Sequence, residues 1–95
     1  MAAPKLTSLP MLLRLYVAGK APNSVRAIAN VQSLCSQHFD SHEIEIVDLL
    51  VHPLRALADK VIVTPTLLRL SPLPVVRVIG TLNDTDQVLG ALAGP

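Results

Sequence analysis

Residues 63–70, VTPTLLRL, constrain the fold most, because they place a proline between two threonines immediately before an apolar run. Proline has no amide hydrogen, so it is excluded from the interior of a sheet and tolerated at the first residue of a strand. The bond that precedes a proline also adopts the cis form at small cost, which other peptide bonds do not. We therefore expect a strand over residues 66–70 that is entered through a cis Thr64–Pro65 bond.

Residues ahead of this strand predict a strand followed by a helix. Residues 11–17 form an apolar run with strand character. Pro22, Asn23 and Ser24 are typical helix-start residues, and we expect Ser24 to act as a cap. The apolar residues that follow have the spacing of one stripe on a helix of about four turns. They are Ala27, Ile28, Val31, Leu34 and Cys35.

The rest of the chain contains four further strand or helix signals around the proline-entered strand. Residues 43–46 alternate Glu-Ile-Glu-Ile, which predicts a strand with one solvated face. Residues 54–60 have helical composition, and residues 75–79 are β-branched and strand-like. Asp84, with a glutamine three residues later, resembles a capping box and predicts a helix that continues to Leu92.

These elements follow the order βαβαββα, and 95 residues suit a single domain. This is the order of the thioredoxin fold, which places a cis-proline at the start of its third strand. The sequence therefore predicts an α/β, thioredoxin-like domain over residues 11–95, preceded by a flexible N-terminus over residues 1–10.

The composition excludes several classes of partner. The chain is 51% hydrophobic with a mean hydropathy of +0.50, which favours self-association or a partner-binding face. Its net charge is +1, its basic residues are scattered and 2% of residues are aromatic, so we expect no nucleic acid partner. The apolar runs are too short to span a bilayer and the start lacks the apolar core of a signal peptide. With one cysteine, the chain is expected to be cytoplasmic, without a membrane partner.

The chemistry of thioredoxin-like enzymes is missing from the expected site. Their redox cysteines lie in the turn before the first helix, and here that turn, residues 21–24, contains no sulfur. We expect Cys35 to be a small buried hydrophobe, and His38, His42 and His52 to be surface or loop residues without metal-ligand spacing. We therefore expect no catalytic residue, no metal and no cofactor, which leaves binding as the function.

Several segments together are specific to a known family. They are LYVAGKAPNSVRA at 15–27, VDLLVHP at 47–53, DKVIVTPTLLRLSPLPVVRVIGTLND at 59–84 and VL at 88–89. On these segments the chain resembles KaiB, the small component of the bacterial circadian oscillator. The resemblance implies a non-enzymatic protein that binds a KaiC-type hexameric ATPase in a circadian or timing system. It also implies a KaiA-like protein and a sensor histidine kinase as further partners.

The resemblance also implies fold switching between two arrangements. Family members have a tetrameric resting fold of order βαββααβ and a thioredoxin-like monomer that binds partners. The residues implicated in the change by the resemblance are Thr64, Pro65, Pro72 and Pro74. Ala91 and Ala93 stand where the family carries glycine and aspartate. Alanine is better than glycine in a helix by about 1 kcal/mol and is a poor strand residue, so both changes favour the thioredoxin-like arrangement.

The resemblance identifies candidate partner-binding residues. Arg26 and Lys60 match basic positions that the family uses toward the ATPase ring, whereas Glu45 stands where the family usually has a basic residue. A reversed charge lowers affinity for an acidic surface, so Glu45 indicates an altered or different partner. The alternative function is therefore a KaiB-like adaptor in stress or signalling without an oscillator. A glutathione-type thiol binder and a histidine kinase sensor domain are two further alternatives.

Overall fold

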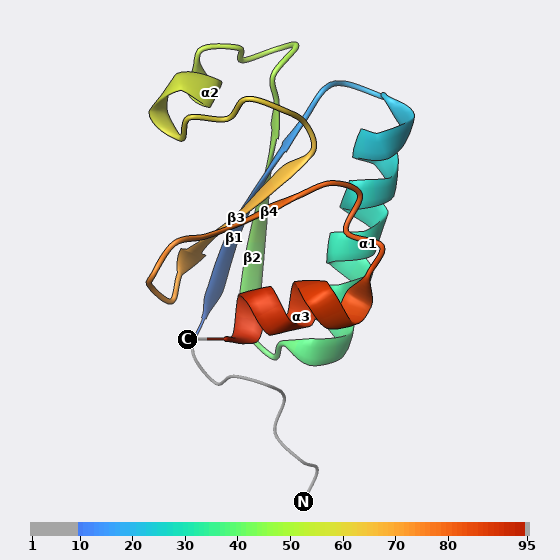
Figure 1. The fold of residues 1–95 in the computed structure, drawn as a ribbon, viewed down its shortest axis with the longest axis vertical. Helices are drawn as coiled ribbons and strands as arrows, with labels where there is room; N and C mark the ends of the chain where they lie inside the picture. The colour runs from blue at the N-terminus through green and yellow to red at the C-terminus, as the bar shows by residue number, and fades with distance from the viewer. Residues whose placement is uncertain (1–9, 95) are drawn as a thin grey trace, which may run out of the picture.

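The structure is a computed structural model that describes residues 10–94 (Figure 1). The predicted flexible segment 1–10 lies, apart from Pro10, outside the described residues. The element order βαβαββα is the predicted one, and within residues 10–94 the alternative order with a C-terminal strand is not observed. The elements are β1 (Met11–Val17), α1 (Pro22–His38), β2 (His42–Asp48), α2 (Arg55–Ala58), β3 (Thr66–Ser71), β4 (Val76–Ile79) and α3 (Thr85–Ala93).

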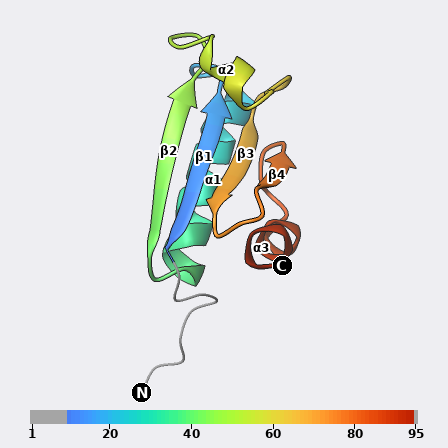
Figure 2. The ribbon, with the colours of Figure 1, turned by 90° about the vertical axis from the view of Figure 1, so that its left-hand side faces the viewer.

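The strands form one sheet of order β2-β1-β3-β4, in which β1 and β2 are parallel and the other pairs are antiparallel. Successive side chains of a strand point to opposite faces, so the sheet has two distinct surfaces. One surface, called the helix face, packs against α1 and α3. The other, called the open face, is covered at one end by α2 and the loop that follows it (Figures 1 and 2).

Alternating residues of β1 and the apolar stripe of α1 build the main core on the helix face. Each fully buried aliphatic side chain contributes about 1.5–3 kcal/mol when it leaves water. Cys35 belongs to this core, as predicted, and burial raises the pKa of its thiol to about 11. A thiol in this environment stays protonated and is unreactive. The buried members are Met11, Leu13, Leu15, Val17, Ala27, Val31, Leu34, Cys35, Phe39, Leu67, Leu82, Val88 and Leu92.

A smaller apolar cluster lies on the open face. Tyr16, Val47 and Leu68 are buried there, one from each of β1, β2 and β3. Val61, from the loop after α2, packs against them and is itself partly buried. The loop is therefore held on the sheet partly by this apolar contact.

The first helix begins differently from the sequence-based expectation. Ala21 is its N-cap and Pro22 its first residue, and Ser24 does not cap the helix. Proline is preorganised for the first helical position, because its fixed φ is helical and its missing amide hydrogen would be unpaired there. Ser24 is buried instead, and its Oγ accepts a hydrogen bond from the Ala18 amide at 3.0 Å. Its hydroxyl thus stabilises the turn after β1.

The last helix begins as predicted, and two of the three histidines lie outside the loops. Asp84 is the N-cap of α3, and its carboxylate accepts a hydrogen bond from the Gln87 amide at 3.1 Å. His38 lies in the last turn of α1, and His42 is the first residue of β2. None of the described helices combines the length and the hydrophobicity needed to cross a membrane.

The predicted cis Thr64–Pro65 bond is confirmed, and the bonds before Pro72 and Pro74 are also cis. Thr66 begins β3 directly after the first of these prolines. Its Oγ1 donates a hydrogen bond to the Val63 carbonyl at 2.6 Å. This hydrogen bond connects the loop before the cis-proline to the start of β3.

Arg69 interrupts the apolar run of β3 and is 1% exposed on the helix face. Its guanidinium donates hydrogen bonds to the carbonyl oxygens of Leu92 at 2.6 Å, Gly94 at 3.0 Å and Pro74 at 2.8 Å. The last carbonyls of a helix lack partners within the helix and carry partial negative charge. Arg69 therefore ties the C-terminal end of α3 and the turn after β3 to the sheet.

Candidate protein-interaction site

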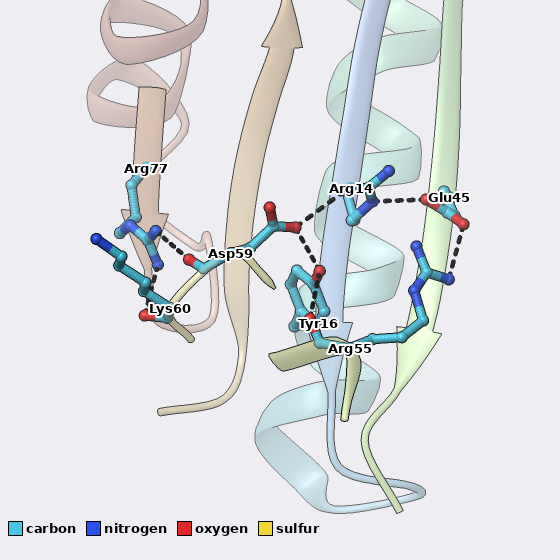
Figure 3. Close-up of polar contacts among 7 residues, drawn as sticks. All are labelled: Arg14, Tyr16, Glu45, Arg55, Asp59, Lys60 and Arg77. Atoms are coloured by element: carbon cyan, nitrogen blue, oxygen red, sulfur yellow. Dashed lines mark hydrogen bonds and ion pairs between the residues drawn. The ribbon is translucent and has the colours of Figure 1, made fainter. Parts of the chain in front are cut away.

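A set of polar side chains joins α2 and its loop to the open face of the sheet (Figure 3). These side chains come from β1, β2, β4 and the α2 segment, which are far apart in sequence. Figure 3 shows them as a continuous series of hydrogen bonds and ion pairs across the strands. We call this set the open-face network; its side chains are those of Arg14, Tyr16, Glu45, Arg55, Asp59 and Arg77.

The strand register brings these residues onto one face. Arg14 and Tyr16 are two positions apart in β1, so both point away from the helices. Arg14 pairs with Glu45 of β2 and with Leu68 of β3, and Leu68 in turn pairs with Arg77 of β4. Laterally paired residues share a face, so the two arginines and the glutamate lie in one row across the sheet.

Glu45 is paired twice within the chain. Its carboxylate accepts from Arg14 Nε at 2.6 Å and from an Arg55 terminal nitrogen at 2.9 Å. The hydrogen bonds from Arg55 and Arg14 lower the pKa of Glu45 to about 2. The charge expected to alter the partner-binding face is thus balanced by two neighbouring guanidinium groups. Whether Glu45 changes the partner stays a prediction.

Asp59, the C-cap of α2, connects the α2 segment to both β1 and β4. Its carboxylate accepts an ion-paired hydrogen bond from Arg14 at 2.9 Å and a short hydrogen bond from the Tyr16 hydroxyl. Its backbone carbonyl accepts from Arg77 at 2.5 Å. The hydrogen bond from Tyr16, helped by Arg14, lowers the pKa of Asp59. Burial, helped by Asp59, raises the pKa of Tyr16, which keeps the phenol protonated as a donor.

The α2 helix ends in a Schellman motif. The Lys60 amide donates to the Leu57 carbonyl at 3.3 Å, and the Val61 amide donates to the Ala56 carbonyl at 2.9 Å. This pattern requires a left-handed residue directly after the C-cap, a position that is usually glycine. Here that residue is Lys60, with a φ of 55°.

A cavity of about 280 Å³ lies beside Lys60, next to the cis-proline loop. Its lining combines two cationic side chains, Lys60 and Arg77, with aliphatic ones. Such a lining suits a ligand group that is acidic and flanked by apolar surface. The remaining lining residues are Ile62, Val63, Thr66 and Ile79.

The α2 segment also exposes aliphatic side chains. None of the four residues of α2 is buried, and Leu57 of this helix is 73% exposed. Large contiguous apolar patches on a protein surface are typical of interaction sites. The exposed aliphatic residues of this segment are Leu50, Val51, Leu54, Leu57 and Ile62. With Lys60 at their edge, they form a candidate surface for a protein partner.

Two of the three predicted binding residues are brought together by the structure. Glu45 belongs to the open-face network, and Lys60 directly follows its member Asp59 in the chain and accepts a backbone hydrogen bond from Arg77. Arg26 lies exposed in the first turns of α1 and donates to the Asn23 side chain at 3.3 Å. No described contact joins Arg26 to the network, although α1 begins at the end of the sheet where α2 lies (Figure 1).

The predicted fold-switch residues are distributed over both ends of β3 and over α3. Thr64 and Pro65 precede β3, whereas Pro72 and Pro74 follow its end. The two alanines lie in the last turn of α3, where Ala91 is half-buried and Ala93 is exposed.

Several network residues were missed by the sequence-based reasoning. Arg14 and Tyr16 stand two positions apart in an apolar strand, and this is the one signal that points to a polar contact on the open face. Arg55, Asp59 and Arg77 resemble ordinary solvated charges in the sequence. Their partners depend on strand register and on the path of the α2 loop.

The site is suited to recognition. The two carboxylates and the tyrosine hydroxyl of the network are each paired with a neighbouring side chain. Among the described residues, no group of three or more histidine, cysteine or acidic side chains is placed to hold a metal ion. What the surface offers is a fixed pattern of cationic and aliphatic groups, which is the chemistry of protein binding.

Two structural neighbours share the fold. The solution structure of the N-terminal domain of Synechococcus elongatus SasA aligns with a TM-score of 0.73 at 21% identity, covering 97% of this chain and 91% of that one. The germline-specific thioredoxin Deadhead of Drosophila melanogaster aligns with a TM-score of 0.71 at 14% identity, covering 97% of both chains. The predicted thioredoxin-like fold is confirmed.

The sequence relatives are circadian clock proteins. The circadian clock oscillator protein KaiB of Synechococcus elongatus (strain ATCC 33912) is 43% identical over 79 residues, which is 82% of this chain and 78% of that protein. The circadian clock protein KaiB3 of Synechocystis sp. (strain ATCC 27184) is 41% identical over 80 residues, covering 83% of this chain and 78% of that protein. A family model for the KaiB domain matches residues 14–93. This chain therefore belongs to the KaiB family.

Proposed function

We propose that this chain is a non-enzymatic, cytoplasmic KaiB-like interaction module that binds a KaiC-type hexameric ATPase in a circadian or timing system. The observation that carries the proposal is the surface around α2, where Lys60 and Arg77 lie beside exposed aliphatic residues on a segment anchored by the open-face network. The membership in the KaiB family, whose matched relatives are clock proteins, supports this partner class.

The proposed binding mode combines two physical contributions. Exposed leucines such as Leu54 and Leu57 leave water on contact and supply affinity at about 25 cal/mol per Å² of apolar area. Lys60 and Arg26 then select an acidic partner surface and accelerate its association. Replacing either cation by alanine is expected to weaken binding about tenfold, mainly through the association rate.

Further partners and a second assembly follow from the family resemblance. We propose a KaiA-like protein and a sensor histidine kinase as further partners of the thioredoxin-like form. We also propose that the chain self-associates in a second arrangement of its C-terminal half. The exposed aliphatic residues of the α2 segment are a reason for the free chain to self-associate, because they are covered by nothing in the described part of the chain.

The primary test is size-exclusion chromatography of the chain with the KaiC-type ATPase of Synechococcus elongatus, with and without ATP. The KaiB of that organism, 43% identical to this chain, is the positive control. We expect co-elution in at least one nucleotide state, and we expect Lys60→Ala to reduce it. If the control co-elutes and this chain does so in no nucleotide state, the proposal is wrong.

The second candidate function is a KaiB-like adaptor in stress or signalling that has another partner and no oscillator. The pairing of Glu45 with Arg14 and Arg55 favours it, because this region then presents a balanced ion-pair cluster instead of a net positive surface. Glu45→Lys discriminates the two functions. If the natural partner is a KaiC-type ATPase with an acidic surface, the variant binds more tightly than the wild type. If affinity falls, the adaptor function is favoured.

A further inference from the structure

Lys60 has a backbone conformation that glycine would adopt at lower cost. Its φ of 55° lies in the left-handed region, which is unfavourable for a residue with a Cβ atom. The Schellman motif that ends α2 requires this conformation, and glycine is the usual residue there. A lysine at this position therefore costs stability. Such a cost, at a site where the surrounding structure fixes the conformation, indicates a role for the side chain.

The backbone of Lys60 is held from two directions. Arg77 of β4 donates hydrogen bonds to the Asp59 carbonyl at 2.5 Å and to the Lys60 carbonyl at 3.4 Å. The Asp59 carboxylate is in turn fixed on β1 by Arg14 and Tyr16. The residue before Lys60 is thus attached to the two strands that flank β3, and Lys60 is itself bonded to β4.

The ammonium group of Lys60 is left available by these contacts. Within the described residues it makes no ion pair or hydrogen bond with a carboxylate. Figure 3 shows it directed away from the Asp59 carboxylate, although the two residues are neighbours in sequence. It borders the 280 Å³ cavity that it shares with Arg77 and Ile79.

We propose that Asp59 and Arg77 are positioning residues that hold Lys60 in its left-handed conformation, so that its ammonium group is preorganised for an acidic group of the partner. The proposal rests on the proposed function, because it assigns a task to residues of the same surface. Preorganisation matters because a backbone that is already fixed loses less conformational entropy on binding. The acidic group, flanked by aliphatic residues of the partner, would enter the cavity beside Ile79.

The first experiment substitutes Lys60→Gly and measures both stability and binding. Because glycine adopts the left-handed region freely, the midpoint of thermal unfolding is expected to rise by about 4 °C. The loss of the ammonium group is expected to weaken binding to the KaiC-type ATPase about tenfold. Lys60→Ala is the matched control, which removes the ammonium group and keeps the backbone cost. A lower unfolding midpoint for Lys60→Gly, or unchanged affinity, would contradict the proposal.

The second experiment tests the positioning role of Asp59 by amide hydrogen exchange in the free protein. Asp59→Ala is expected to accelerate exchange of residues 55–63 about tenfold while β1 and α1 stay protected. Asp59→Asn keeps acceptor geometry for Tyr16 and Arg14 and is expected to restore part of the protection. Glu43→Gln, an exposed carboxylate of the same sheet outside the network, is the control and should change nothing. Unchanged exchange in Asp59→Ala rules out the positioning role.

The third experiment is a double-mutant cycle for partner affinity. If Asp59 acts through Lys60, then Asp59→Ala weakens binding in the wild type and has no further effect in the Lys60→Gly background. If Asp59 had a structural role alone, Asp59→Ala would weaken partner binding equally in the wild-type and Lys60→Gly backgrounds. That outcome would overturn the proposal. If the wild type itself does not bind the ATPase, the proposed function fails. The exchange experiment still shows whether Asp59 orders the α2 loop.

Discussion

The two halves of the domain are stabilised in different ways. In the first half, β1 and α1 are joined by buried apolar side chains, five residues of α1 being buried, and the partly buried Ile44 of β2 packs against them. In the second half, α2 buries none of its side chains and α3 buries two. The second half also contributes Leu67, Leu82, Val88 and Leu92 to this core, but its two helices are held in addition by polar contacts: the open-face network holds α2, and Arg69 holds the end of α3.

This difference determines how each half responds to change. Apolar burial is non-directional, so a core tolerates small shifts of its members. Hydrogen bonds depend on distance and angle, and they are lost when one partner moves by about 1 Å. The second half therefore depends on a few side chains, each linking segments that are distant in sequence. This is the half that our proposal of a second arrangement requires to rearrange.

The largest effect is expected from Leu15→Ala, a truncation in the centre of the aliphatic core. Leu15 is 0% exposed, and such a change costs about 2–5 kcal/mol through lost burial and the cavity that remains. Because this core joins α1, α3 and the sheet, both halves should lose stability together. Urea unfolding followed by circular dichroism measures the total loss in the free energy of unfolding. Amide exchange that accelerated in one half alone would show that the core does not couple them.

The next effect is expected from Arg69→Met, which removes the polar attachment of α3. Three carbonyl oxygens lose their donor, and each hydrogen bond to a charged donor contributes about 1.5–3 kcal/mol. Part of this loss is offset, because the variant no longer buries a charge. We expect a net cost of about 2 kcal/mol, expressed as faster amide exchange in α3 and residues 71–76. Arg69→Lys keeps the charge but has fewer donors, so its stability should lie between those of the wild type and Arg69→Met.

Uniform acceleration of exchange in Arg69→Met, extending to α1, would erase the distinction between the halves. Leucine at position 69 provides a second control, because it fills the site without a polar group. If that variant matched the wild type in stability, the bonds of Arg69 would be balanced by the cost of burying its charge.

The sequence predicts the two halves unequally well. The strand β1 follows from an apolar run and the helix α1 from apolar periodicity, and the proline at position 65 correctly predicts where β3 begins. Periodicity is informative here because each side chain is buried by its neighbours on the same element. The misplaced cap at Ser24 is a local error, since a buried serine and a capping serine have the same sequence signature.

The polar contacts of the second half could not be predicted in the same way. Arg14 and Asp59 are 45 positions apart, and their pairing requires both the strand register and the path of the α2 loop. Arg69 bonds to backbone carbonyls, which every residue carries, so nothing in the sequence identifies its partners. The strain at Lys60 is equally invisible, because the left-handed conformation is a property of the motif that ends α2.

The smallest effect is expected from Glu45→Gln, which weakens the exposed end of the open-face network. Its side chain is 46% exposed, so the loss of its ion pairs at pH 7 should cost no more than about 1 kcal/mol. The folded pKa of about 2 lies below the unfolded value of about 4.3, so Glu45 stabilises the fold above pH 5. That contribution is lost as the pH falls toward 2. The lowered pKa of Asp59 adds a contribution of the same sign.

Chemical unfolding of the wild type and of Glu45→Gln at pH 7 and pH 3 measures this contribution. The difference between the two proteins should be smaller at pH 3 than at pH 7, because the wild-type carboxylate is then mostly protonated in the unfolded chain and the benefit of its pairing shrinks. Addition of 0.5 M salt at pH 7 should also reduce the difference, since exposed ion pairs are screened. A constant difference across pH and salt would mean that Glu45 acts through packing. The second half would then resemble the first more closely than its polar contacts indicate.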